Sequence, residues 1–467
     1  MLKKGTELEL KIESLAYGAR GVARVDDFVI FVDGGIPGQT VNAFLYKKRK
    51  GFGEARVVEV LKQSSDYVVP RCEHFDFCGG CRAQHLEYAE QVNQKRQQVE
   101  NIFRRMAGIK DIKIDTVVPS DPYFHYRNKM EFTFSNRRWL LPDEPENVEK
   151  DFALGLHIPK RFDKILDINE CHIQQTLGNG ILNLVRAVAK ENNLKPYDVR
   201  THIGFLRHLV LRFGVNTNQV MVNFVTSYEN TDFLQPIVDA LLEKYPKITS
   251  IINNVNTRKG DTAHGEYEII LHGTPTIEEK MGELTFEVSA NSFFQTNSIQ
   301  GEKLYEIALE GADITKDDIV YDLYCGTGTI TLYIAKYAKE VHGFEVIVSA
   351  LEDAARNAVS NGIGNTFFHK ANLDTFFTQT GLVKKLPKPD VVIVDPPRAG
   401  MHEKMARHLA KIGAKRIVYI SCNPATQARD TRIILDRGYT LTKLAVVDMF
   451  PHTAHVETVA VFTKSSE

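Results

Sequence analysis

Cys422 stands where a cysteine can act as a nucleophile. It follows the apolar run Arg416–Ile420, which predicts a buried strand, and Pro424 prevents that strand from continuing. Open α/β sheets bind their ligands at the carboxyl ends of their strands, which is the position expected for this thiol. Free cysteines are also among the most buried residues, so a packing role is the alternative.

A carboxylate, Glu457, leads into the last predicted strand, His455–Phe462. A thiolate and a carboxylate at neighbouring strand ends are what methylation of a pyrimidine carbon needs. C5 of uracil is a poor nucleophile until a thiolate adds at C6, and a base must then remove the C5 proton. The sequence therefore predicts Cys422 as nucleophile and Glu457 as base, with a surface carboxylate or a helix cap as the alternative for Glu457.

The segment Asp322–Thr329 predicts a cofactor pocket. Its glycines lie between the predicted strand Ile319–Leu323 and a helix, so the backbone there can approach a ligand closely. Glu345 ends the next strand, nineteen positions after Gly326, and an acidic residue at that spacing suits ribose hydroxyls. Thr331 occupies the third glycine position of the dinucleotide pattern, so the sequence favours S-adenosylmethionine over a dinucleotide.

The tetrapeptide Asp395-Pro396-Pro397-Arg398 follows the fourth strand of this region. Its two prolines fix a rigid turn beside the cofactor, and such a turn can present a planar base to backbone carbonyls. With the glycine turn and the acidic second strand, it predicts a methyltransferase.

Three cysteines, Cys72, Cys78 and Cys81, lie within ten residues, and Cys171 lies farther along the chain. One clustered trio with a remote fourth ligand favours a [4Fe-4S] cluster, whose role we expect to be structural. A zinc ion held by the same four thiolates is the alternative, because tetrahedral thiolate ligands suit both. The one cysteine left, Cys325, is expected to pack inside the glycine turn.

The length and composition of the chain indicate what kind of protein carries these sites. At 467 residues the chain is expected to form two to four domains, and 43% hydrophobic and 25% charged residues are typical of a globular protein. The polar start and the lack of a long apolar run predict a cytoplasmic protein without a membrane partner. The net charge of −1 does not favour nucleic acid, but local basic clusters such as Lys47–Lys50 do.

Three regions must position the candidate residues. Residues 1–62 predict about five short strands and an OB-type barrel with a basic turn at Lys47–Gly53, a fold that often binds oligonucleotides. Residues 63–285 predict a mixed α+β domain that carries the cysteines. From 286 to 467, strands alternate with glycine turns and helices, which predicts a doubly wound α/β sheet.

The motifs together resemble one family. They are Cys72-x5-Cys78-Gly-Gly-Cys81 with Cys171, Ser-Phe-Phe-Gln295-Thr-Asn, Asp-Leu-Tyr-Cys-Gly-Thr-Gly, Asp-Pro-Pro-Arg, Ser-Cys-Asn-Pro and His-Val-Glu457-Thr. In this order they resemble the bacterial RNA uracil-C5 methyltransferases, above all those of the RlmD type, which act on 23S rRNA. The resemblance covers nearly the whole chain.

The resemblance implies an N-terminal TRAM barrel that binds RNA, an iron–sulfur cluster in the central domain, and a C-terminal Rossmann-like class I methyltransferase domain. It implies Cys422 as nucleophile and Glu457 as proton acceptor. It also implies the residues that line the S-adenosylmethionine pocket, which are Gln295, Tyr324, Glu345 and Asp395, with Thr329 and Asn372 as neighbours.

A uracil inside a stem cannot expose C6 to a thiolate, so the target is expected to be a flipped-out uridine, most readily from a loop. The resemblance implies that the RNA is 23S rRNA. Lys47–Lys50, Arg127 and Lys129 are the candidate contacts to the flanking RNA, and no obligate protein partner is expected. A tRNA uracil-C5 methyltransferase and a non-catalytic, cluster-bearing RNA-binding protein are the alternatives. In the family resemblance, the barrel and the cluster together point away from the tRNA enzyme.

Overall fold

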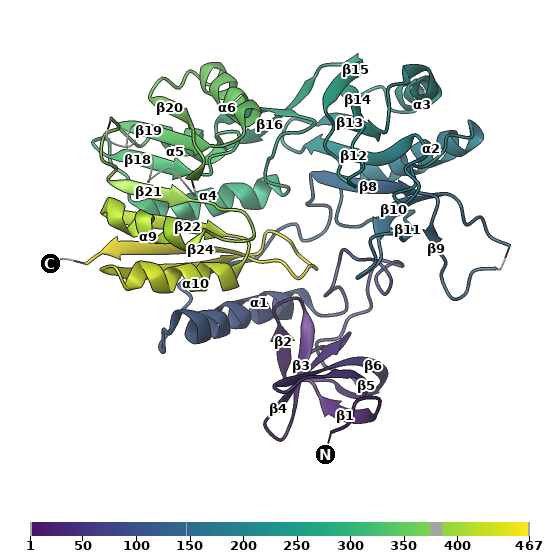
Figure 1. Cartoon of the computed structure of the whole chain (residues 1–467), viewed down its shortest axis with the longest axis horizontal. Coiled ribbons are helices and arrows are strands. Elements are labelled where there is room, and N and C mark those ends of the chain that lie inside the picture. The colour runs from purple at the N-terminus through teal and green to yellow at the C-terminus, as the bar shows by residue number, and fades with distance from the viewer. Residues whose placement is uncertain (1, 146, 374–384, 466–467) are drawn as a thin grey trace.

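The computed structural model describes residues 2–145, 147–373 and 385–465 (Figure 1). Three sheets follow one another along the chain, with a small hairpin between the second and the third. In Figure 1 the first sheet lies at the bottom, the second at the upper right and the third at the left.

The N-terminal sheet has six strands in the order β1-β5-β6-β4-β3-β2. Alternate residues, such as Leu10, Val41 and Ala43, face inward and form a small apolar core, as the period-2 pattern of strands requires. The sequence predicted about five strands here, and the structure has one more. Their bounds are β1 Glu7–Lys11, β2 Ser14–Ala16, β3 Arg20–Val25, β4 Phe28–Asp33, β5 Thr40–Lys48 and β6 Phe52–Lys62.

The central sheet has eight strands in the order β15-β14-β13-β12-β8-β10-β11-β9. Helices α2 (Thr176–Glu191) and α3 (Thr231–Lys244) cover one of its faces, where Phe132 and Phe224 pack in a common core with apolar residues of both helices. The strands are β8 Lys129–Ser135, β9 Arg138–Trp139, β10 Ala153–His157, β11 Ile165–Asp167, β12 Leu206–Gly214, β13 Gln219–Thr226, β14 Ser250–Val255 and β15 Tyr267–Gly273.

The C-terminal sheet has the order β20-β19-β18-β21-β22-β24-β23-β7. Its first five strands are parallel, whereas β24 is antiparallel to both of its neighbours. Because of this reversal, β24 begins at the edge where β22 ends. The strands are β18 Ile319–Leu323, β19 Glu340–Glu345, β20 Thr366–Lys370, β21 Val391–Val394, β22 Arg416–Ser421, β23 Tyr439–Val447 and β24 Glu457–Lys464.

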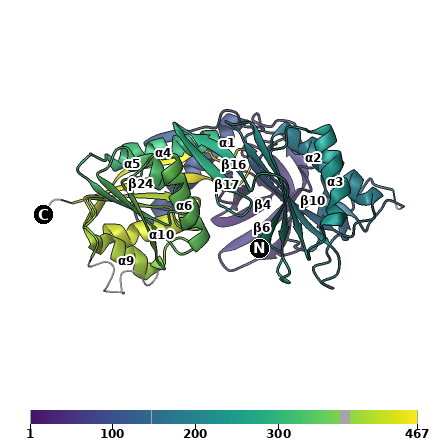
Figure 2. The same ribbon diagram turned by 90° about the horizontal axis from the view of Figure 1, so that it is seen from above.

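Helices cover both faces of this sheet, as expected for a doubly wound fold. Figure 2 shows α4 and α5 on one side and α9 and α10 on the other. The hairpin of β16 and β17 packs with α4 in one of the two cores. The bounds are β16 Thr276–Met281, β17 Leu284–Ser289, α4 Ser298–Ala312, α5 Thr329–Ala335, α6 Val348–Ser360, α9 Glu403–Ile412 and α10 Pro424–Leu435.

One part of the segment 63–285 belongs to the C-terminal sheet. Strand β7 (Thr116–Val118) pairs with β23, and helix α1 (Tyr88–Ile102) continues into a π-helical turn, η1 (Phe103–Ala107), whose Phe103 packs in the same core as Leu444. The expected domain boundaries at 62 and 285 remain a prediction, but the sheets do not follow them strictly. In the described residues no helix is long and apolar enough to cross a membrane.

Candidate active site at the carboxyl edge of the C-terminal sheet

Five of the predicted site residues follow five neighbouring parallel strands. All five strands point the same way, so the residues after them gather at one edge of the sheet, where open α/β folds bind ligands. In chain order these residues are Tyr324 after β18, Glu345 at the end of β19, Asn372 after β20, Asp395 after β21 and Cys422 after β22.

Cys422 lies between the last residue of β22 and the first turn of α10. Asn423 caps that helix by accepting a hydrogen bond from the N–H of Ala425 at 3.1 Å, so the partly exposed thiol stands on a fixed turn. Its pKa is raised to about 11, first by burial and then by the charges of Glu457 and Asp395, while Arg398 acts in the opposite direction. The thiol is therefore mostly protonated near neutral pH in the absence of ligands.

Glu457 is the first residue of β24 and its side chain is buried. In the pairing of β22 with β24, Ser421 lies opposite Thr458, which brings the start of β24 beside Cys422. Burial raises the pKa of the Glu457 carboxyl well above its ordinary value, Asp395 raises it further, and Arg398 lowers it. The two predicted catalytic groups thus lie within electrostatic reach of each other.

Two more acidic groups lie at this edge. Burial is the first cause that raises the pKa of Asp322 and of Asp395 to about 7 each. The charge of Glu345 adds to the raised pKa of Asp322, and the charge of Asp322 adds to that of Asp395. Asp322 accepts a hydrogen bond from the hydroxyl of Thr331 at 2.6 Å. An edge with several acidic groups and one nearby arginine favours a cationic ligand.

The glycine turn between β18 and α5 has room for a ligand. Gly326 and Gly328 have φ of 53° and 79°, a region that favours glycine, and a Cβ on Gly326 would meet nothing within 4 Å. A Cβ on Gly328 would instead lie 2.9 Å from that of Ala354, so this position has no space for a side chain. The N–H of Gly326 donates to the carboxylate of Glu345 at 3.3 Å, which joins the turn to the acidic strand end.

The other four predicted pocket residues lie in different surroundings. The segment that carries Gln295 is tied to the glycine turn, because the hydroxyl of Thr327 donates to the carbonyl of Phe293 at 3.1 Å. The hydroxyl of Thr329 bonds that of the buried Tyr305 at 2.9 Å, so it faces the interior. Tyr324 has φ of 67°, and Asn372 is exposed at the sheet edge.

Tyr17 is a site residue that the sequence did not indicate. It comes from the N-terminal barrel, just after β2, yet its hydroxyl lies 3.5 Å from the carbonyl oxygen of Cys422. Burial raises the pKa of Tyr17, and Cys422, Arg398 and Glu457 all act on it electrostatically. The chain separation of 405 residues explains why no local pattern could reveal this contact.

The barrel is held in this position by contacts with α1. The N–H of Leu15 donates to Oε1 of Gln94 at 2.7 Å, and Leu15 packs with Ile36 and Leu86 in a small apolar cluster. The placement of Tyr17 at the catalytic edge therefore depends on α1, which itself packs on the C-terminal sheet.

Cys171 belongs to the same core as Cys78 and Cys81 although it is remote from them in sequence, and its charge acts on Cys72. Cys78, Cys81 and Cys171 are buried in the central core, and burial is the first cause that raises the pKa of every one of the four thiols. The pKa of each thiol is also raised by the charge of at least one other: that of Cys81, for example, is raised by Cys171, Cys78 and Cys72.

The loop around these cysteines requires its glycines. A Cβ on Gly79 would lie 2.4 Å from the carbonyl oxygen of His157, whereas the N–H of Gly79 donates to that oxygen at 3.0 Å. The N–H of Gly80 faces the sulfur of Cys78 at 3.4 Å. Within the described residues, no group of three or more Cys, His, Asp or Glu side chains is arranged to hold a metal ion. The chemistry of the donor set, four free thiols that act on one another electrostatically, nonetheless fits a thiolate-ligated centre.

The same loop supports the segment that leads to Glu457. The N–H groups of Arg82 and Ala83 both donate to the carbonyl oxygen of His452, at 2.7 and 3.0 Å. The ring of His452 stacks on Phe124 with 4.2 Å between the centroids. The cysteine loop and the catalytic edge are therefore in direct contact.

Two of the predicted RNA-binding lysines are engaged in ion pairs. Lys47 pairs with Glu54 at 2.6 Å and Lys129 with Glu131 at 2.5 Å. Arg127 donates from Nε to the carbonyl oxygen of Lys129 at 2.8 Å. These contacts reduce the positive charge that the side chains can offer to RNA.

Comparison with known proteins identifies the regions. A family model described as tRNA (Uracil-5-)-methyltransferase matches residues 271–465, and the model of the TRAM domain matches residues 2–58. A protein of Chlorobaculum tepidum named as an RNA methyltransferase is 41% identical over 99% of this chain and 97% of its own length. One of Porphyromonas gingivalis with the same name is 39% identical over 98% of this chain and 100% of its own.

A solved structure is similar over the same length. The Pyrococcus abyssi tRNA (uracil-54, C5)-methyltransferase, in complex with S-adenosyl-L-homocysteine, is 29% identical with a TM-score of 0.74, covering 97% of this chain and 99% of its own. Residues 1–62 make up about 13% of the chain, so an alignment that covers 97% of the chain includes most of the N-terminal barrel. The expectation that such a barrel points away from a tRNA enzyme is therefore not supported.

Proposed function

The chain belongs to the family of RNA uracil-C5 methyltransferases and depends on S-adenosylmethionine, and from this premise we propose that it methylates a uridine through a covalent bond between Cys422 and C6 of the base. The observation that carries the proposal is the antiparallel β24, which brings Glu457 to the strand end that holds Cys422. Thiol and carboxyl then reach the two neighbouring carbons, C6 and C5, of one flipped base.

The steps balance with these two residues. The Cys422 thiolate adds to C6, and the electrons of the C5–C6 double bond move to make an enolate that is nucleophilic at C5. When bound, S-adenosylmethionine supplies the methyl group that C5 takes up. The Glu457 carboxylate then removes the proton from C5, the C6–S bond breaks, and the double bond and the free thiolate are restored.

The raised pKa values fit a site that is completed by its ligands. In the free protein, burial and mutual repulsion hold Cys422, Asp395 and Glu457 toward their protonated forms. A positive charge at this edge, such as the sulfonium of the cofactor, favours the ionised forms of all three. We infer that cofactor binding prepares the nucleophile and the base, with Arg398 as the resident cation.

Tyr17 gives the TRAM barrel a role inside the active site. Its hydroxyl lies 3.5 Å from the carbonyl oxygen of Cys422, and the residue belongs to the region that matches the TRAM domain. A flipped base needs an apolar face to replace the stacking that it loses, and an aromatic ring provides one. We infer that Tyr17 borders the uracil and couples RNA binding by the barrel to catalysis.

For the RNA, we propose 23S rRNA as substrate, on the four-cysteine set that accompanies the barrel. A tRNA is the second candidate, because the solved tRNA enzyme is similar over nearly the whole chain. The two are separated by mapping 5-methyluridine in the rRNA and tRNA of a deletion strain, complemented with the wild-type chain or with Cys422→Ala. Loss of one 5-methyluridine from 23S rRNA, restored only by the wild type, is the expected result, and loss from tRNA alone would select the second candidate.

We further propose that Cys72, Cys78, Cys81 and Cys171 hold a [4Fe-4S] cluster. The thiols act on one another electrostatically, and one clustered trio of cysteines with a remote fourth ligand suits a four-iron cluster. Iron, sulfide and zinc are measured in anaerobically purified wild type, in Cys81→Ser and in Cys325→Ser as the control. Four irons and four sulfides, lost only in Cys81→Ser, are expected, whereas one zinc per chain would favour the alternative.

A further inference from the structure

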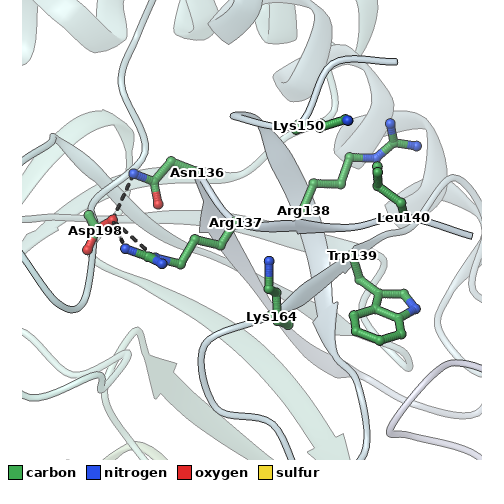
Figure 3. A pocket seen from close by; sticks show the side chains of 8 residues that line it. All are labelled: Asn136, Arg137, Arg138, Trp139, Leu140, Lys150, Lys164 and Asp198. Carbon is green, nitrogen blue, oxygen red and sulfur yellow. Dashed lines mark hydrogen bonds and ion pairs between the residues drawn. The ribbon is translucent and has the colours of Figure 1, made fainter. Parts of the chain in front are cut away.

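A cavity lies on the central domain, apart from the carboxyl edge of the C-terminal sheet. It has a volume of about 600 Å³, which is enough for a nucleotide. Its walls come from β9 and from the four segments that join β8 to β9, β9 to β10, β10 to β11 and α2 to β12. Figure 3 shows the lining residues, which are Asn136, Arg137, Arg138, Trp139, Leu140, Lys150, Lys164 and Asp198.

The cavity is basic even after its ion pairs are counted. Arg137 donates to Asp198 at 3.1 and 3.2 Å, and Arg138 pairs with Glu144. Lys150 and Lys164 take part in no ion pair among the described residues. The two lysine charges are therefore uncompensated, and in Figure 3 Lys164 rises between the two arginines.

A buried donor of Arg138 also lacks a partner. Its Nε has no hydrogen-bond acceptor, although NH1 donates to the carbonyl oxygen of Glu149 at 3.2 Å. Buried donors without acceptors are costly, so such a group in a basic cavity indicates a missing anionic ligand. Arginine and lysine together are the usual partners of phosphate.

Trp139 adds an aromatic wall. It is the one tryptophan in the sequence, it is partly exposed, and its inner side packs against the core of the central domain. In Figure 3 it lies on the side of the cavity away from Asp198. An indole face beside basic groups suits the binding of single-stranded RNA, because bases stack on the ring while the cations neutralise the phosphates.

The cavity lies next to the RNA-binding barrel. The loop between β10 and β11 carries Lys160, whose Nζ lies 3.4 Å from a carboxylate oxygen of Asp33 and over the ring of Tyr46, both in the barrel. Lys164 ends the same loop. A strand of RNA that crosses the barrel can thus continue into the cavity.

We propose that this cavity binds one nucleotide of the RNA substrate away from the methylated uridine, with its phosphate against Lys150, Lys164 and Arg138 and its base against Trp139. The inference rests on the proposed function, because it takes the substrate to be RNA. It assigns to the central domain a second anchoring point that lengthens the stretch of RNA read by the protein.

Tryptophan fluorescence tests the site directly, because Trp139 is the one source of the signal. Titration of the full-length protein with oligouridylate is expected to quench this fluorescence saturably. In Lys150→Ala/Lys164→Ala the quenching should need more RNA, and the slope of log affinity against log salt should fall by about 0.7 for each lost phosphate contact. The matched control is Lys110→Ala/Lys113→Ala, two exposed lysines between η1 and β7.

Anisotropy of a labelled oligouridylate, measured in parallel, reports RNA binding anywhere on the protein. Saturated anisotropy without a change in Trp139 fluorescence would overturn the proposal, as would equal losses in the lysine variant and its control. Trp139→Leu, which keeps an apolar side chain against the core, should weaken binding while the melting temperature stays near that of the wild type. If no uridine is methylated but the quenching and its lysine dependence are present, the proposed function fails and the cavity assignment stands.

Discussion

Thiols with raised pKa values lie both at the carboxyl edge of the C-terminal sheet and in the central domain, but their surroundings differ. Cys422 is partly exposed, stands on the turn between a strand and a helix, and has carboxyls and Arg398 around it. Cys78, Cys81 and Cys171 are buried in the apolar core of the central domain, among other thiols and backbone N–H groups. One environment leaves a single thiol open to a substrate, and the other brings several thiols together away from it.

The difference shows that burial alone does not decide what a cysteine does. Burial raises the pKa at both places, so the chemistry depends on access and on the neighbouring groups. A thiol with a base and a cation beside an open edge suits catalysis, whereas thiols that face one another suit a metal centre. The four predictions below test this contrast.

Cys422→Ala should have the largest effect. Without the sulfur no C6 adduct can form, so methyl transfer to RNA should fall by at least about 10³-fold. Binding of S-adenosylhomocysteine, measured by calorimetry, and the melting temperature should remain near the wild-type values. Cys171→Ser should show the opposite pattern: it should lower the melting temperature more than it lowers methyl transfer. Turnover by Cys422→Ala above a hundredth of wild type would contradict the assignment.

Glu457→Gln should slow turnover by about 10²–10⁴-fold, because the C5 proton then lacks its acceptor. The reaction stops after methyl transfer, so a covalent protein–RNA adduct should accumulate and migrate slowly in a denaturing gel. Glu310→Gln, an exposed carboxylate on α4, is the control and should turn over normally. A Glu457→Gln protein that is slow but forms no adduct would show that another group removes the proton.

Alkylation should separate the two kinds of thiol by pH. The pKa of Cys422 is about 11, so its thiolate fraction, and with it the rate of labelling by iodoacetamide, should rise about tenfold per pH unit between pH 7 and 9. Arg398→Gln removes a charge that lowers this pKa, so labelling should slow at each pH. Peptide mass spectrometry should find Cys78, Cys81 and Cys171 unlabelled in the folded protein. Rapid labelling of any of them would contradict the difference in access between these thiols and Cys422.

Tyr17→Ala should have the smallest effect, a several-fold rise in KM for RNA with a smaller fall in kcat, because the ring borders the base without reacting with it. Tyr17→Phe should stay near wild type, since the hydroxyl contact of 3.5 Å is long for a hydrogen bond. Tyr67→Ala is the matched control, with nearly the same exposure, 37% against 38%. Equal effects of Tyr17→Ala and Tyr67→Ala would remove Tyr17 from the site.

Much of the fold follows from local patterns. The apolar run before Cys422 is β22, the strand expected before Asp395 is β21, and the glycine turn does join a strand to a helix. The predicted strand Ile319–Leu323 agrees with β18 at both ends. Such elements are predictable because alternating side chains, prolines and glycines act within a few residues.

Contacts between distant segments were not predictable in this way. Strand β7 joins the C-terminal sheet from a region assigned to the central domain, and Thr329 turns its hydroxyl to Tyr305. The expected charges of Lys47 and Lys129 are paired with glutamates. Each result depends on a partner that the local sequence does not contain.

The sequence by itself determined the family, the α/β architecture and the residues able to do the chemistry, because residue type and short-range spacing carry that information. Only the tertiary structure decided which of them meet. The antiparallel β24 brings Glu457 to Cys422, and the docked barrel adds Tyr17. Electrostatic coupling and base stacking act over a few ångströms in space, whatever the separation along the chain.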